Sequence, residues 1–176
     1  FKTIFKKSNQ EYWCRVDQTV MLGSVPIVLM GHVEELYARY NVRCVINLMD
    51  EYSGPIATYQ KLNISQAYFP TVDHFEPTLE TLEAATRVLS ECKKKGWVAY
   101  VHCKGGHGRS AAVAAAWLLS KDGGSMSPTQ AQNHLNSIGH VRKKLLKQPN
   151  LQRFYRLHTD NTTDEALGDE STPLVR

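Results

Sequence analysis

A glycine-rich segment between an apolar run and a helix-forming run constrains this chain most strongly. Trp97–Val101 is a short, β-rich apolar stretch, and Ala111–Leu119 is dominated by alanine and leucine, which favour helix. Residues 102–110, which lie between them, read His-Cys-Lys-Gly-Gly-His-Gly-Arg-Ser. The segment therefore predicts a strand-to-helix turn that begins with a cysteine at the end of a buried strand.

The turn is suited to binding an anion. Gly105, Gly106 and Gly108 allow successive backbone N–H groups to point inward as a concave nest. The helix that follows presents the positive end of its dipole to the same point. We therefore expect a phosphate dianion to bind in this loop.

The side chains of the turn fit the cleavage of a phosphate ester. A cysteine at a helix N-terminus near cations has a pKa of roughly 3.5–7.5, against about 8.5 when free, so Cys103 is the predicted nucleophile. Arg109 offers a planar cationic fork for two phosphate oxygens. A hydrogen bond from Ser110 to the sulfur would ease departure of the thiolate when a phosphocysteine is hydrolysed. His102 is interpreted as an orienting residue beneath the loop.

A covalent mechanism also needs an acid to protonate the leaving alkoxide. Asp73 is our candidate, because it follows a strand-like run over 66–72 and lies thirty residues before Cys103. A loop at the edge of a sheet is a plausible place for such a group. His74 and Glu76 are neighbouring alternatives.

Two further residues of the loop bear on the substrate. Lys104 and His107 are expected at the mouth of the pocket, where they would attract a second anionic charge, unless they are simply solvated. A metal site is not predicted, because Cys14, Cys44 and Cys92 are scattered and lack paired ligand spacing. We expect no cofactor.

Strand-like and helix-like segments alternate along the chain. Strands are expected over 15–22, 43–48, 66–72 and 97–101, and helices over 33–40, 79–92, 111–119, 128–138 and 150–157. This order predicts a single α/β domain with a central, mostly parallel sheet and helices on both faces. The cysteine loop then lies at the carboxyl end of a strand, where such sheets usually bind ligands.

Three segments are expected. Residues 1–10 are basic and hydrophobic and could lie on a membrane surface, 11–158 form the catalytic domain, and the acidic, threonine-rich 159–176 are expected to be disordered. The net charge of +4 permits an anionic partner without requiring one, and no nucleic-acid partner is expected. A thiolate nucleophile needs a reducing compartment.

The cysteine loop and its spacing from Asp73 resemble the cysteine-dependent dual-specificity phosphatases. Further blocks, over about residues 10 to 158, are similar to the mitochondrial phosphatidylglycerophosphate phosphatase branch: Tyr12–Asp17, Val20–Pro26, Asn41–Leu48, Asp50–Tyr52 and Thr71–Asp73. The resemblance implies Cys103 as nucleophile, Arg109 as phosphate binder and Asp73 as general acid. It also implies a mitochondrial location, with the cytoplasm as the alternative.

The interior of the loop departs from that branch. Where the branch usually carries Ala-Gly followed by Arg or Ser, this chain has Gly105, Gly106, His107 and Gly108. With Lys104, this interior resembles the loop of the tumour-suppressor phosphoinositide 3-phosphatase. Both resemblances imply a lipid headgroup, but they imply different ones.

Three functions follow from the sequence. The leading one is a phosphatase for an anionic phospholipid, either phosphatidylglycerophosphate or a phosphoinositide. The second is a dual-specificity protein phosphatase acting on phosphotyrosine and phosphoserine or phosphothreonine. A non-catalytic phosphate-binding module is the third, although such a module would not require the thiol of Cys103.

Overall fold

The protein is built around one five-stranded sheet, seen in a computed structural model that describes residues 12–139 and 141–165, the side chains of 160–165 excepted. The strand order is β1-β2-β5-β3-β4. The strands are β1 Trp13–Arg15, β2 Val20–Gly23, β3 Val42–Met49, β4 Ser65–Thr71 and β5 Val98–His102. All neighbouring pairs are parallel except β1 with β2, which confirms the predicted mostly parallel sheet.

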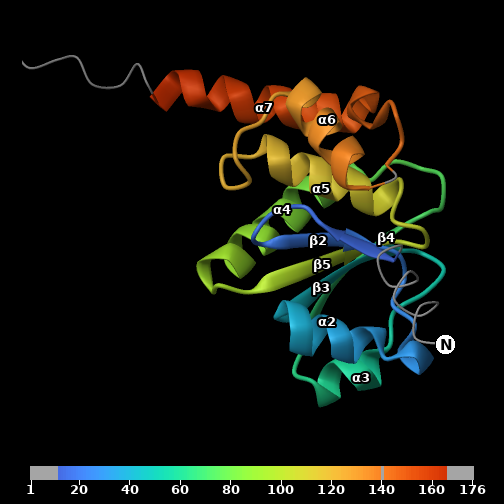
Figure 1. Cartoon of the computed structure of the whole chain (residues 1–176). Helices are drawn as coiled ribbons and strands as arrows, with labels where there is room; N and C mark the ends of the chain where they lie inside the picture. The colour runs from blue at the N-terminus through green and yellow to red at the C-terminus, as the bar shows by residue number, and fades with distance from the viewer. Residues whose placement is uncertain (1–11, 140, 166–176) are drawn as a thin grey trace, which may run out of the picture.

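Helices cover both faces of the sheet, as the alternation of segments predicts (Figure 1). One face carries α2 (His32–Tyr40) and α3 (Ile56–Lys61). The other face carries α4 (Leu79–Lys94), α5 (Arg109–Leu119), α6 (Pro128–Ile138) and α7 (Pro149–Glu165). Two short 3-10 helices, η2 (Val28–Met30) and η3 (Leu145–Lys147), lie in connections.

Helix α5 lies at the centre of the larger core. Every one of its residues is buried, and it packs against α4, α6 and α7 as well as the sheet. Its run of alanines allows these neighbours to approach closely, while Trp117 and Leu118 fill the space between them. The start of α5 is thereby fixed relative to the sheet, and this start is the end of the cysteine loop.

The strand expected over 15–22 is instead a β-hairpin, and this expectation was wrong. Asp17 makes the turn, because its Oδ1 accepts hydrogen bonds from the backbone N–H groups of Thr19 at 2.8 Å and Val20 at 2.7 Å. Its Oδ2 accepts a hydrogen bond from Nε1 of the buried Trp117 at 2.6 Å. The turn is therefore anchored to the central helix.

The other differences between the structure and the sequence-based predictions concern helices. The short helix α3 was not predicted, and α7 continues to Glu165, beyond the expected end at residue 157 and into the segment expected to be disordered. Residues 1–10 and 166–176 lie outside the described part of the chain. Within the described residues, no helix has both the length and the hydrophobicity needed to span a bilayer.

Replacing Asp17 with alanine should destabilise the fold. The substitution removes two turn hydrogen bonds and leaves the buried indole N–H of Trp117 without its acceptor. We expect the free energy of unfolding to fall by about 3 kcal/mol, measured by urea denaturation. Asp122→Ala, at an exposed position, is the control and should change it little. Equal stabilities of the two variants would contradict this account of the turn.

Candidate active site

The parallel strands bring three sequence-distant residues to one edge of the sheet. Cys103 directly follows β5, Glu51 follows β3, and Asp73 follows β4. These strands are neighbours in the order β5-β3-β4 and run parallel, so their carboxyl ends meet at the same edge. In Figure 1 the loops that follow these strands all lie on the right-hand side of the sheet.

The cysteine loop is held from outside through its carbonyl groups. The carbonyl of Lys104 accepts a hydrogen bond from the N–H of Val25 at 3.2 Å, and that of His107 accepts one from the N–H of Arg142 at 3.1 Å. Of the loop N–H groups, that of Gly106 points inward, to the sulfur of Cys103. An anion nest formed by further inward N–H groups stays a prediction from the glycine spacing.

Gly106 allows the loop to approach strand β2. Its φ of 78° is in the left-handed region, and a Cβ at this position would lie 2.8 Å from the carbonyl carbon of Gly23. A side chain is thus excluded by both the backbone conformation and the space. This position directs the Gly106 N–H to the sulfur of Cys103, at 3.3 Å.

The thiol of Cys103 is buried and surrounded by hydrogen-bond donors. The hydroxyl of Ser110 donates to its Sγ at 3.1 Å, in addition to the N–H of Gly106. Burial by itself would raise the pKa of this thiol, but the donors from Ser110 and Gly106, with the charge of Arg109, hold it below its ordinary value. The arrangement therefore stabilises a thiolate.

Arg109 is the first residue of α5, and its side chain is only 1% exposed. Its Nη1 and Nη2 donate to the two carboxylate oxygens of Glu51 at 2.7 and 2.8 Å, and Nη1 also donates to the carbonyl of Thr71 at 2.8 Å. The hydrogen bonds from Arg109 lower the pKa of Glu51 to about 2. The guanidinium is thus fixed beside the loop by a carboxylate that is ionised at neutral pH.

Asp73 lies against the same arginine. Its Oδ1 is 3.1 Å from Nη2 of Arg109, and its side chain is partly exposed at the edge of the site. The two alternatives have other partners: Glu76 accepts a hydrogen bond from the backbone N–H of Asn150 at 3.3 Å, and the strongly exposed His74 has its Nε2 3.8 Å from Oδ2 of Asp73. Of the three acids considered, the structure places Asp73 next to Arg109.

His102 lies beneath the loop and is fully buried. Its Nδ1 is 3.4 Å from the carbonyl oxygen of Cys103, and its ring stacks on Tyr100 with centroids 5.8 Å apart. Burial lowers the pKa of His102 to about 4, with a further contribution from the charge of Arg109. A neutral imidazole in this place fits the predicted orienting role better than a proton shuttle.

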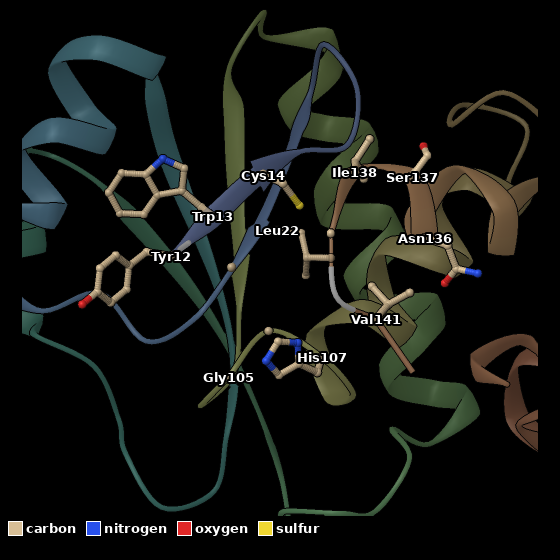
Figure 2. A pocket seen from close by; sticks show the side chains of 13 residues that line it. Tyr12, Trp13, Cys14, Leu22, Gly105, His107, Asn136, Ser137, Ile138 and Val141 are labelled. Atoms are coloured by element: carbon tan, nitrogen blue, oxygen red, sulfur yellow. The ribbon is translucent and has the colours of Figure 1, made fainter. Parts of the chain in front are cut away.

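Lys104 and His107 are both exposed. His107 lines a cavity of about 510 Å³ on the side of the loop that faces β1 and β2, and Cys103 is not part of its lining. Figure 2 shows the His107 ring beside Gly105, with Trp13 and Cys14 also around the cavity. The role of Lys104 and His107 toward a second anionic charge remains a prediction.

Sequence reasoning missed the role of Glu51. The residue was noted only within a block of resemblance, although it lies two residues after the end of the buried strand β3, and Asp73 lies two residues after the end of β4. That shared position is the signal that could have identified it. Its contact with Arg109, fifty-eight residues away, depends on the pairing of β3 with β5.

Comparison with known families agrees with this geometry. Residues 28–157 match the model of the dual specificity phosphatase catalytic domain, which covers most of the chain. The chain belongs to the dual specificity phosphatase family. It is therefore a member of a family of phosphoric monoester hydrolases.

Two relatives and one crystal structure show which members of the family are similar to this chain. The human phosphatidylglycerophosphatase and protein-tyrosine phosphatase 1 is 28% identical over 169 residues, which cover 90% of this chain and 81% of that protein. A Dictyostelium discoideum phosphatidylinositol 3,4,5-trisphosphate 3-phosphatase is 35% identical over 104 residues, but these span only 58% of this chain and 16% of that protein. The crystal structure of PTPMT1 in complex with PI(5)P has a TM-score of 0.72 at 28% identity, covering 88% of this chain and 99% of that one.

The reactivity of Cys103 should show its lowered pKa. Because the thiolate forms as pH rises through the pKa, alkylation by iodoacetamide should reach half its maximal rate below about pH 8.5, the value for a free thiol. Ser110→Ala removes a donor to the sulfur and should move this midpoint upward by about one pH unit. Mass spectrometry of the Cys103 peptide measures the rate. Cys14, whose pKa burial raises, is an internal control that should react slowly. Unchanged midpoints in Ser110→Ala would contradict the prediction.

Removing the charge of Glu51 should impair catalysis by misplacing Arg109. Glu51→Gln replaces one carboxylate oxygen with an NH₂ group that repels the guanidinium. We expect kcat/KM for a soluble aryl phosphate to fall about a hundredfold, and the melting temperature to fall as well, because the buried guanidinium loses part of its charge compensation. Asp50→Asn, at the exposed neighbouring position, serves as the control. Wild-type kinetics in Glu51→Gln would show that Arg109 does not depend on this contact.

Proposed function

We propose that this protein hydrolyses the phosphate monoester of an anionic phospholipid through a phosphocysteine intermediate. The observation that carries the chemistry is the Cys103 sulfur, which lies 3.1 Å from the Ser110 hydroxyl and 3.3 Å from the Gly106 N–H within the loop that ends at Arg109. A nucleophile, an anion nest and a cation thus share one small volume.

The reaction proceeds in two steps. The phosphate binds to the loop N–H groups and Arg109, and the Cys103 thiolate attacks phosphorus as the ester oxygen leaves with a proton from Asp73. The ionised Asp73 then accepts a proton from a water molecule, which attacks the phosphocysteine and releases inorganic phosphate. Ser110 stabilises the departing thiolate with its hydrogen bond. No metal or cofactor enters these steps.

The lipid substrate is supported by relatives and by the mouth of the site. The human relative is named a phosphatidylglycerophosphatase, and the PTPMT1 crystal structure holds PI(5)P. Lys104 is exposed beside the loop, where its charge can meet a second anionic group of a headgroup. The first candidate is phosphatidylglycerophosphate and the second a phosphoinositide. The resemblance to the mitochondrial phosphatidylglycerophosphate phosphatase branch is the ground for proposing a mitochondrial location, with the cytoplasm as the alternative.

A substrate panel tests the proposal. Turnover of phosphatidylglycerophosphate, of singly and multiply phosphorylated inositides, and of phosphopeptides is compared by release of inorganic phosphate. We expect a lipid to have the highest kcat/KM, and Cys103→Ser to lower every activity by at least about a thousandfold. Preference for phosphopeptides would replace the lipid with a protein substrate. Full activity of Cys103→Ser would refute the covalent mechanism.

A further inference from the structure

Exposed apolar side chains gather at the edge of the sheet that carries the active site. Among the described residues, ten large hydrophobic side chains are exposed: Ile27, Val28, Leu29, Met30, Tyr52, Ile56, Tyr68, Val72, Phe75 and Leu157. Eight of them lie between β2 and α2, from β3 to the first residue of α3, or between β4 and α4. The two exceptions are Tyr68, within β4, and Leu157, in α7.

The topology places the segments that carry these eight side chains on either side of the catalytic loop. Strand order β2-β5-β3-β4 puts the loop after β2 on one side of the Cys103 loop and the loops after β3 and β4 on the other. The N–H of Val25 donates to the carbonyl of Lys104, so the segment that leads to η2 contacts the catalytic loop directly. Neighbouring strands lie about 4.8 Å apart, and the group therefore spans roughly 15 Å. We call these eight residues the apolar rim.

Core packing does not account for the two most exposed members of the apolar rim. Leu29 is 100% exposed and Phe75 is 67% exposed, so neither side chain contributes appreciably to the core. Isolated exposed hydrophobic residues are common, but a gathering of them around a site marks a surface that meets an apolar partner. The partner must therefore present an apolar region at the level of the scissile phosphate.

We propose that the apolar rim docks onto the surface of a lipid bilayer, so that Cys103 faces the headgroup layer. The proposal rests on the function proposed above and adds how the substrate is reached. In a bilayer the phosphate monoester lies directly above the acyl chains, which matches a phosphate nest flanked by apolar side chains. Apolar side chains of interfacial proteins enter the boundary between headgroups and acyl chains by roughly 5–10 Å. Lipid molecules therefore remain in the membrane during catalysis.

The charges on this edge add an electrostatic attraction to the apolar one. Lys104 is exposed on the catalytic loop, and the guanidinium of the exposed Arg142 lies against Gly108 of the same loop, whereas Asp50 is an exposed carboxylate at this edge. The two carboxylates at the active site are in contact with the buried arginine. Binding should consequently persist on neutral phosphatidylcholine vesicles and be strengthened when phosphatidylglycerol is added.

Leu29→Asp is the decisive variant, because Leu29 is fully exposed and its loop holds no proposed catalytic residue. We expect the ratio of vesicle-bound to free protein to fall about tenfold in sedimentation with phosphatidylcholine vesicles. Hydrolysis of substrate lipid in vesicles should fall in proportion. Turnover of a soluble aryl phosphate and of a short-chain, monomeric lipid phosphate should stay at the wild-type level, which also shows that the variant is folded.

Leu157→Asp is the matched control, since Leu157 is 43% exposed but lies on α7, away from the active-site edge. It should leave vesicle binding unchanged. Leu29→Trp gives a second readout, because its fluorescence should shift to the blue and be quenched by brominated lipids when vesicles are added.

Several results would overturn the docking proposal. If Leu29→Asp binds vesicles as well as the wild type does, the apolar rim does not dock onto the bilayer. A wild-type dimer that Leu29→Asp dissociates would assign the apolar rim to a second copy of the chain. A loss confined to phosphoprotein turnover would assign it to a protein partner. If the wild type binds vesicles through Leu29 but hydrolyses neither lipid form, docking stands and the proposed lipid substrate fails.

Discussion

The outward anchoring of the loop between β5 and α5 is the constraint on which the site depends. A chain segment can surround an anion with N–H groups only if its carbonyl oxygens have partners elsewhere, because each peptide carries both. Val25 and Arg142 supply partners from two different connections, and Gly106 permits the contact with Gly23 that the turn requires. Segments remote in sequence therefore determine the shape of a loop whose own residues appear sufficient to specify it.

The buried guanidinium of Arg109, next to this loop, must also be supplied with hydrogen-bond acceptors. An uncompensated charge in the interior is costly, so Arg109 needs acceptors whether or not phosphate is bound. Glu51, Asp73 and the carbonyl of Thr71 provide them, and all three lie at the ends of β3 and β4. One of these acceptors, Glu51, is an ionised carboxylate that repels an incoming phosphate. The inward N–H groups of the loop and the helix dipole must therefore supply much of the phosphate affinity.

How far the sequence predicts this molecule depends on how local the decisive interactions are. Strands β3 and β5 follow from their short apolar, β-rich runs, α4 from the helical spacing of its apolar residues, and α5 from its alanine- and leucine-rich composition. The hairpin after Trp13 does not, because its turn residue Asp17 is fixed by Trp117, a hundred residues away. Helix α3 is only six residues long and has no side-chain cap, so little local signal marks it. The position of Glu51 after β3 is visible in the sequence, but its contact with Arg109 depends on the pairing of β3 with β5.

The same topology links the chemistry to the surface. Loops at the carboxyl ends of parallel strands lie together at one edge of the sheet, which is why they can carry Cys103, Glu51 and Asp73 toward one point. Leu29 and Phe75 lie outside the core, on segments that follow β2 and β4 at the same edge. An apolar side chain that gains nothing from folding is retained at little cost to stability, yet it raises the risk of aggregation in water. A membrane partner removes that cost, because the surface that water disfavours is covered whenever the active site meets its substrate.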